Sequence, residues 1–157
     1  MQVEFQGDNV MISKEDFFKH FGSGTAQTIG INLPKIVVME AKETDLSQQV
    51  TDELVKLGIP RHIKGFGYLR EAIILSVNDE VYIEHITRRL YPEVAATFAS
   101  TPSGVERAIK HAIEVGCSKN PDGMGRTFNR SMSVLSDKPV NSEFIATIAD
   151  NIRLARQ

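Results

Sequence analysis

The chain has 157 residues, which fits one domain of ordinary size with a small appendage. Hydrophobic residues make up 41% and charged residues 24%, so the composition excludes a disordered, collagen-like or coiled-coil protein. The apolar runs are too short to cross a bilayer and the N-terminus has no signal pattern, so we predict a cytoplasmic protein with no membrane partner. The single cysteine, Cys117, excludes an internal disulfide and a cysteine-rich zinc site.

The net charge of −2 disfavours nucleic-acid binding through the overall field of the protein. The charge is unevenly distributed, however. Residues 1–45 carry four Lys and seven Asp or Glu, whereas residues 46–157 carry fourteen Lys or Arg and thirteen acids. Because the second segment is only mildly basic, any DNA binding must depend on a local cluster of cations.

The first 45 residues predict a small α+β appendage. An alternating segment at residues 2–6 precedes a helix that Ser13 caps, and a strand rich in Ile and Val follows at residues 35–40. Polar residues 40–48 predict a linker. We therefore place a domain boundary between residues 45 and 46, with an N-terminal element that dimerises, pairs an edge strand or binds a partner.

Helical periodicity begins at Leu46 and continues almost to the C-terminus. Gly58 and Pro60 close the first helix, and Pro92 opens a short one because its missing N–H is unpaired there in any case. The pattern predicts a mainly α domain over residues 46–157. The expected helices cover residues 46–57, 67–77, 81–90, 93–98, 101–119 and 141–154.

Residues 94–119 show the pattern of a helix-turn-helix. Thr101 is placed to cap the second helix, Pro102 occupies its first turn, and Ala95 offers a small side chain where two helices cross. Many helical proteins that bind no DNA also contain such a pair, so this alternative stays open. The outer face of the second helix carries residues of types that read bases and hold phosphates: Ser103, Gly104, Glu106, Arg107, Lys110 and His111.

Three blocks of sequence resemble the C-terminal effector domain of the stage zero sporulation protein A family, the master response regulator of endospore formation. The resemblance implies a six-helix bundle whose long fourth helix enters the major groove of an AT-rich operator, in tandem or as a homodimer, to regulate transcription. The blocks are GIPRHIKGFGYLREAI at residues 58–73, LYP at 90–92 with VERAIKHAIEV at 105–115, and NSEFIA at 141–146 with Ala149, Asp150, Arg153 and Leu154.

Further residues join this interpretation. We assign Thr101 to the DNA-binding set and expect Lys64 and Arg70 to reach phosphates. The alternative for Lys64 is that it holds the main chain of the protein in place. The last predicted helix supplies the dimer interface through Phe144, Ile148 and Ile152.

The sequence departs from the family pattern at four places. Gly104 and Lys110 stand where the family has arginines, which removes one base-reading side chain and one guanidinium fork. A loop is predicted at residues 120–125 in place of the short fifth helix, which the family associates with the sigma subunit of RNA polymerase. Residues 1–45 are too few for a phospho-receiver domain of about 120 residues.

Other chemistries find little support. Residues 22–25 lack the Lys-Ser or Lys-Thr of a phosphate-binding loop, and the four histidines lack the spacing of metal ligands. We predict no metal, no cofactor and no enzymatic activity. The predicted function is a sequence-specific regulator that binds double-stranded DNA. The alternative is a modulator that binds no DNA and forms mixed dimers with a full-length regulator or another protein.

Overall fold

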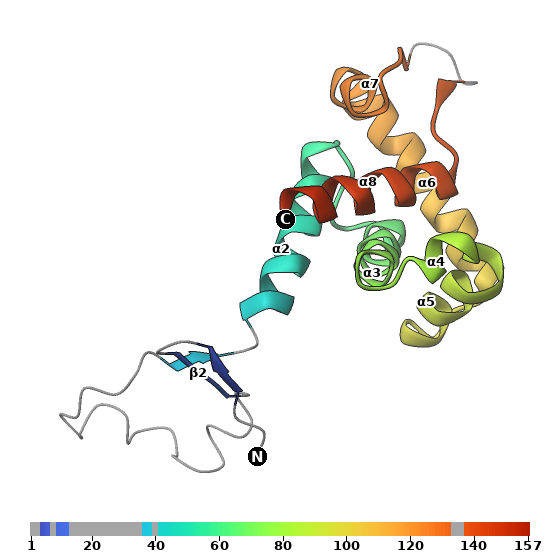
Figure 1. Cartoon of the computed structure of the whole chain (residues 1–157). Helices are drawn as coiled ribbons and strands as arrows, with labels where there is room; N and C mark the ends of the chain where they lie inside the picture. The colour runs from blue at the N-terminus through green and yellow to red at the C-terminus, as the bar shows by residue number, and fades with distance from the viewer. Residues whose placement is uncertain (1–3, 7–8, 13–35, 39–40, 133–136) are drawn as a thin grey trace. The chain divides into compact units, whose positions relative to one another are not determined.

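A computed structural model describes residues 4–6, 9–12, 36–38, 41–132 and 137–157, with side chains described from Asp45 onward. Contacts between residues divide the chain into two compact units, Met1–Leu46 and Ser47–Gln157. Figure 1 shows the helices of the second unit crossing one another. No helix in the described ranges combines the length and the hydropathy that a membrane span requires.

Three short strands of the first unit form one sheet in the order β1-β2-β3. β1 (Glu4–Gln6) pairs antiparallel with β2 (Asn9–Ile12), which pairs parallel with β3 (Ile36–Val38). β3 lies within the strand expected at residues 35–40, whereas the sequence patterns do not predict β2. The helix expected from Ser13 lies outside the described residues.

The mainly α prediction is confirmed. α2 (Ala41–Lys56) covers residues 41–48, where a linker was predicted, so that prediction is wrong. The Ala, Lys, Glu and Gln residues of this segment favour a helix, which continues directly into the apolar face that contains Leu46 and Val50. The elements are α2 (Ala41–Lys56), α3 (Lys64–Asn78), α4 (Val81–Glu84), the π-helical turn η2 (Ile86–Leu90), α5 (Tyr91–Thr97), α6 (Pro102–Lys119), α7 (Pro121–Phe128) and α8 (Asn141–Ala155).

The single helix expected over residues 81–90 is divided in two. His85 leaves the helical region, with φ −128° and ψ 50°, and separates α4 from η2. The N–H of Leu90 then bonds the carbonyl of His85, five residues earlier, at 3.3 Å. Because of this break and of α7, the described residues form seven α-helices and one π-helical turn rather than the expected six helices.

The loop predicted at residues 120–125 is also wrong, because α7 occupies this segment. Asn120 caps it: the side-chain Oδ1 accepts from the N–H of Gly123 at 2.9 Å, and Nδ2 donates to the carbonyl of Lys56 at 2.8 Å. Pro121 stands in the first turn, where its missing donor costs nothing, and Met124 is fully buried. A cap, a proline and one apolar anchor thus outweigh the two glycines of the segment.

α3 lies at the centre of the second unit, with α6 and α8 packed against it (Figure 1). Leu69 and Ile73 of α3 are fully buried, as are Ile109 of α6 and Phe144 of α8. The N-terminus of α3 approaches α6 especially closely, because a methyl group at Gly65 would overlap the carbonyl oxygen of Ala108. The core therefore holds α6 by its apolar face.

Candidate nucleic-acid interface

A tight turn connects α5 to α6. The N–H of Ser100 donates to the carbonyl of Ala95 at 2.8 Å, and Ala99 adopts the left-handed conformation with φ 51°. Ala95 is only 3% exposed and lies where α5 and α6 pack. The small side chain predicted at this crossing is therefore buried, and the turn leads the chain directly into α6.

The start of α6 is capped as the sequence predicts. The Thr101 hydroxyl accepts from the N–H of Gly104 at 3.1 Å, and the Thr101 carbonyl accepts from the N–H of Val105 at 2.9 Å. Pro102 fills the first helical position. The Thr101 hydroxyl also lies 3.4 Å from the hydroxyl of Ser103, the next predicted DNA-contacting residue along the helix.

α6 presents two distinct faces. Val105, Ile109 and Ile113 are buried, so the opposite side faces solvent. Within the described part of the chain, the side chains of Arg107, Lys110 and His111 make no hydrogen bond or ion pair. Gly104 is half-buried, and the predicted outer residues that are exposed are Ser103, Glu106, Arg107, Lys110 and His111.

Asn141, the first residue of α8, holds α6 from its other side. Its Nδ2 donates to the main-chain carbonyl of Glu106 at 2.9 Å and to the hydroxyl of Tyr91 at 3.1 Å. Burial raises the pKa of the Tyr91 phenol, and the nearby Glu106 carboxylate acts in the same direction while the bond from Asn141 opposes it. The side-chain amide of Asn141 therefore connects α8 to the start of α5 and to the N-terminal half of α6.

An ion pair supports the start of α8. Arg130 binds Glu143 through two parallel hydrogen bonds of 2.8 Å and donates a third, of 2.6 Å, to the carbonyl of Asp137. The bonds from Arg130 hold the pKa of Glu143 below its usual range. Glu143 lies in the first turn of α8 with Asn141, so the pair helps to position the amide that holds α6.

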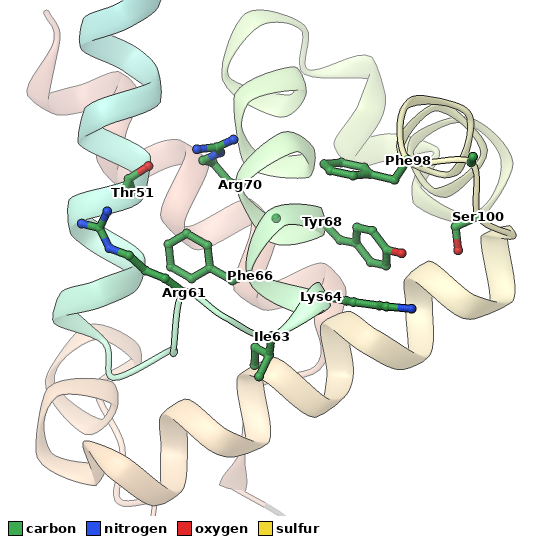
Figure 2. A pocket seen from close by; sticks show the side chains of 11 residues that line it. Thr51, Arg61, Ile63, Lys64, Phe66, Tyr68, Arg70, Phe98 and Ser100 are labelled. Atoms are coloured by element: carbon green, nitrogen blue, oxygen red, sulfur yellow. The ribbon is translucent and has the colours of Figure 1, made fainter.

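Lys64 and Arg70 of α3 line an open groove with a volume of about 590 Å³, shown in Figure 2. Lys64 is exposed and extends along α6 toward Ser100, while Arg70 is half-buried and lies on the side of Thr51. Tyr68 and Phe98 meet edge to face in the groove, with ring centroids 5.0 Å apart. The two predicted phosphate contacts thus belong to one surface beside α6.

The predicted dimer residues lie in the interior. Phe144 and Ile148 are fully buried and Ile152 is 6% exposed, all within the core of one chain. A second chain that docks on α8 would meet exposed neighbours such as Leu154, which is 65% exposed. The expectation that α8 contributes to a dimer stays a prediction.

Sequence reasoning missed two contributors to this surface. Asn141 is the first residue of a predicted helix, and its side chain bonds to other helices rather than to its own. Arg130 lies in a segment without helical periodicity. No local pattern indicates either contact, because the partners are distant along the chain.

No group of three or more His, Cys, Asp or Glu side chains among the described residues could hold a metal ion. Cys117 is buried and burial raises its thiol pKa, in agreement with a packing role. A comparison with models of known families finds a match to the family described as Sporulation initiation factor Spo0A C terminal, over residues 50–152. This range runs from α2 into α8 and contains every residue assigned above to DNA or dimer contacts.

Proposed function

Because the chain belongs to the family of Spo0A C-terminal domains, a family of DNA-binding effector domains in transcription regulation, we propose that it recognises specific double-stranded DNA sequences through α6. α5, its turn and α6 then form a helix-turn-helix, with α6 in the major groove. The observation that carries this proposal is the exposed outer face of α6. Its cations are unpaired within the described residues, on a helix that the core and Asn141 hold firmly.

Each side chain of this face has a chemistry suited to DNA. Arg107 can fork onto the O6 and N7 of a guanine, and Glu106 can accept from the N4 amine of a cytosine. Lys110 supplies a point charge for a phosphate. The remaining contacts to bases and phosphates come from Ser103, His111 and the backbone at Gly104, with Thr101, Lys64 and Arg70 on phosphates.

The proposal also assigns different roles to different parts of the chain. Residues 46–157 form the DNA-binding domain and residues 1–45 a separate element. No receiver domain is evident in the match, which covers residues 50–152. We place a homodimer contact on α8 and a contact with the sigma subunit of RNA polymerase on α7, which provides a helix where a loop was expected. We propose a cytoplasmic location in line with this DNA-binding role.

Fluorescence anisotropy tests the proposal. The purified full chain is titrated onto a duplex that carries the AT-rich operator of the family and onto a scrambled duplex, each at two salt concentrations. We expect salt-sensitive binding with at least a tenfold preference for the operator, or about 1.4 kcal/mol. Equal or absent binding on both would refute the proposal and favour a modulator that pairs with another regulator.

Two variants separate reading from anchoring. Arg107→Ala should cost about 1–3 kcal/mol on the operator and relax sequence preference, whereas Lys110→Ala should weaken binding to both duplexes alike and reduce the salt slope by about one. Both side chains are exposed, so neither change should alter folding. Equal losses on the two duplexes for Arg107→Ala would exclude its base contact.

A further inference from the structure

The groove beside α6 contains a third cation, Arg61, that no assignment above includes. Arg61 extends from the turn between α2 and α3, and Figure 2 shows it with Arg70 on the α2 side of the groove while Lys64 points toward Ser100. Tyr68 and Ser100 add hydroxyl-bearing side chains to the groove, whereas the Thr51 hydroxyl donates to the carbonyl of Ser47 within α2 at 2.7 Å. Among the described residues, no acidic side chain does so. The groove is therefore a positively charged surface with hydroxyl donors.

These three cations differ from the arginines that stabilise the fold. Arg130 is bound to Glu143, and Arg153 to Glu80 and Asp150, each through hydrogen bonds of 2.7–2.8 Å. By contrast, the side chains of Arg61, Lys64 and Arg70 have neither a hydrogen bond nor an ion pair across residues 41–132 and 137–157. Three like charges in one groove repel one another unless an anion neutralises them. The described residues therefore supply no anion that neutralises the three cations of the groove.

The position of the groove indicates which anion. One end is formed by Ser100, two residues before α6, and Lys64 lies beside the half of α6 that the proposed function places on DNA. Gly65, the next residue, packs against Ala108 in the middle of α6. A DNA strand carries one phosphate per about 3.4 Å of helix axis. If α6 binds a duplex, the phosphates of that duplex continue beyond α6 toward the groove. Binding of DNA to α6 would not bring an acidic peptide to the same place.

We propose that Arg61, together with Lys64 and Arg70, binds phosphates of the DNA that flanks the segment read by α6. This inference rests on the proposed function. It makes the groove a backbone clamp that lengthens the bound stretch of duplex and adds affinity without adding sequence preference. Arg61, at the far side of the groove from Ser100, holds the outermost phosphate.

Arg61→Gln tests the clamp against a matched control, Arg126→Gln. Both arginines are exposed and without a hydrogen bond or ion pair in the part of the chain that the structure describes, but Arg126 lies on α7. Anisotropy is measured on operator and scrambled duplexes over a range of salt concentrations. Arg61→Gln should weaken binding to both duplexes roughly five- to tenfold near 0.1 M salt and lower the salt slope by about one. Arg126→Gln should bind like the wild type.

A series of operator duplexes shortened from each end locates the contact. The difference between the wild type and Arg61→Gln should disappear once the flanking base pairs are removed, while the loss caused by Arg107→Ala should persist. If Arg61→Gln binds the long duplex as tightly as Arg126→Gln does, the clamp is refuted. This result is expected if the groove binds an acidic protein segment instead of DNA. If the wild type binds no duplex, the proposed function fails as well, so the two failures are distinguishable. Thermal denaturation of both variants checks that folding is unchanged.

Discussion

Gly65 and Gly67 lie two residues apart in α3, yet alanine at the two positions should have opposite effects on stability. A methyl group at Gly65 would lie 2.7 Å from the Cβ of Ala112 and would overlap the carbonyl oxygen of Ala108, both on α6. A methyl group at Gly67 would meet only the ring of Phe98, at 3.6 and 3.7 Å, which is ordinary contact. The first substitution must move α3 away from α6, whereas the second requires no movement.

The expected magnitudes follow from these contacts. To reach ordinary contact with Ala112, α3 and α6 must separate by more than half an ångström along backbone that is packed on all sides. Such overpacking costs about 1–3 kcal/mol, partly offset by the helix preference of alanine over glycine, about 0.5–1 kcal/mol. We expect Gly65→Ala to lower the free energy of unfolding by a net value of about 1 kcal/mol. Gly67→Ala should raise it by about 0.5–1 kcal/mol.

Urea denaturation of the full chain, followed by circular dichroism, measures both changes. With a slope of about 2 kcal/mol/M, the urea midpoint of Gly65→Ala should fall by about 0.5 M and that of Gly67→Ala should rise by about 0.3 M. Gly65→Ala should also weaken DNA binding, because α6 shifts on its support. Equal midpoints for the two variants would show that the close approach of α3 to α6 does not constrain the fold.

Three further predictions concern α6: two test residues that hold it in place, and one tests its contact with DNA. Asn141→Ala removes two hydrogen bonds, one of them to the carbonyl of Glu106, and should cost about 1–3 kcal/mol in urea denaturation; an unchanged midpoint would refute the role of the amide. Because Arg130 depresses the folded-state pKa of Glu143, the pair stabilises the fold above the unfolded pKa of about 4.3 and loses this effect as the pH falls through the folded value. The stability advantage of the wild type over Glu143→Gln, measured from pH 7 to 3, should therefore shrink only on the acid side. Gly104→Arg adds a cation, and its Cβ would lie 3.0 Å from the Thr101 hydroxyl, which must shift slightly. In a variant that thermal denaturation shows to be folded, the salt slope of DNA binding should steepen by about one, and an unchanged slope would show that position 104 does not face DNA.

Local signals in the sequence predict much of the helical unit correctly. The cap at Thr101 and the proline after it locate the start of α6, because both act within one helical turn. Apolar periodicity identifies the buried face that contains Val105 and Ile109, and hence the exposed opposite face. Pattern reasoning failed at α7, where the glycines obscured a helix whose buried anchor, Met124, is meaningful only when packed.

The primary structure alone therefore establishes the helical class, the family resemblance and the identity of the side chains that α6 offers to a ligand. These features depend on residues close together in the chain, whose caps and periodicity can be read directly. The arrangement around α6 depends instead on residues far apart in sequence. The bond from Asn141 to Glu106, the contact of Gly65 with Ala108 and the shared groove of Arg61 with Ser100 form only when the helices pack. Burial and close approach are properties of the packed core, so no local pattern specifies them.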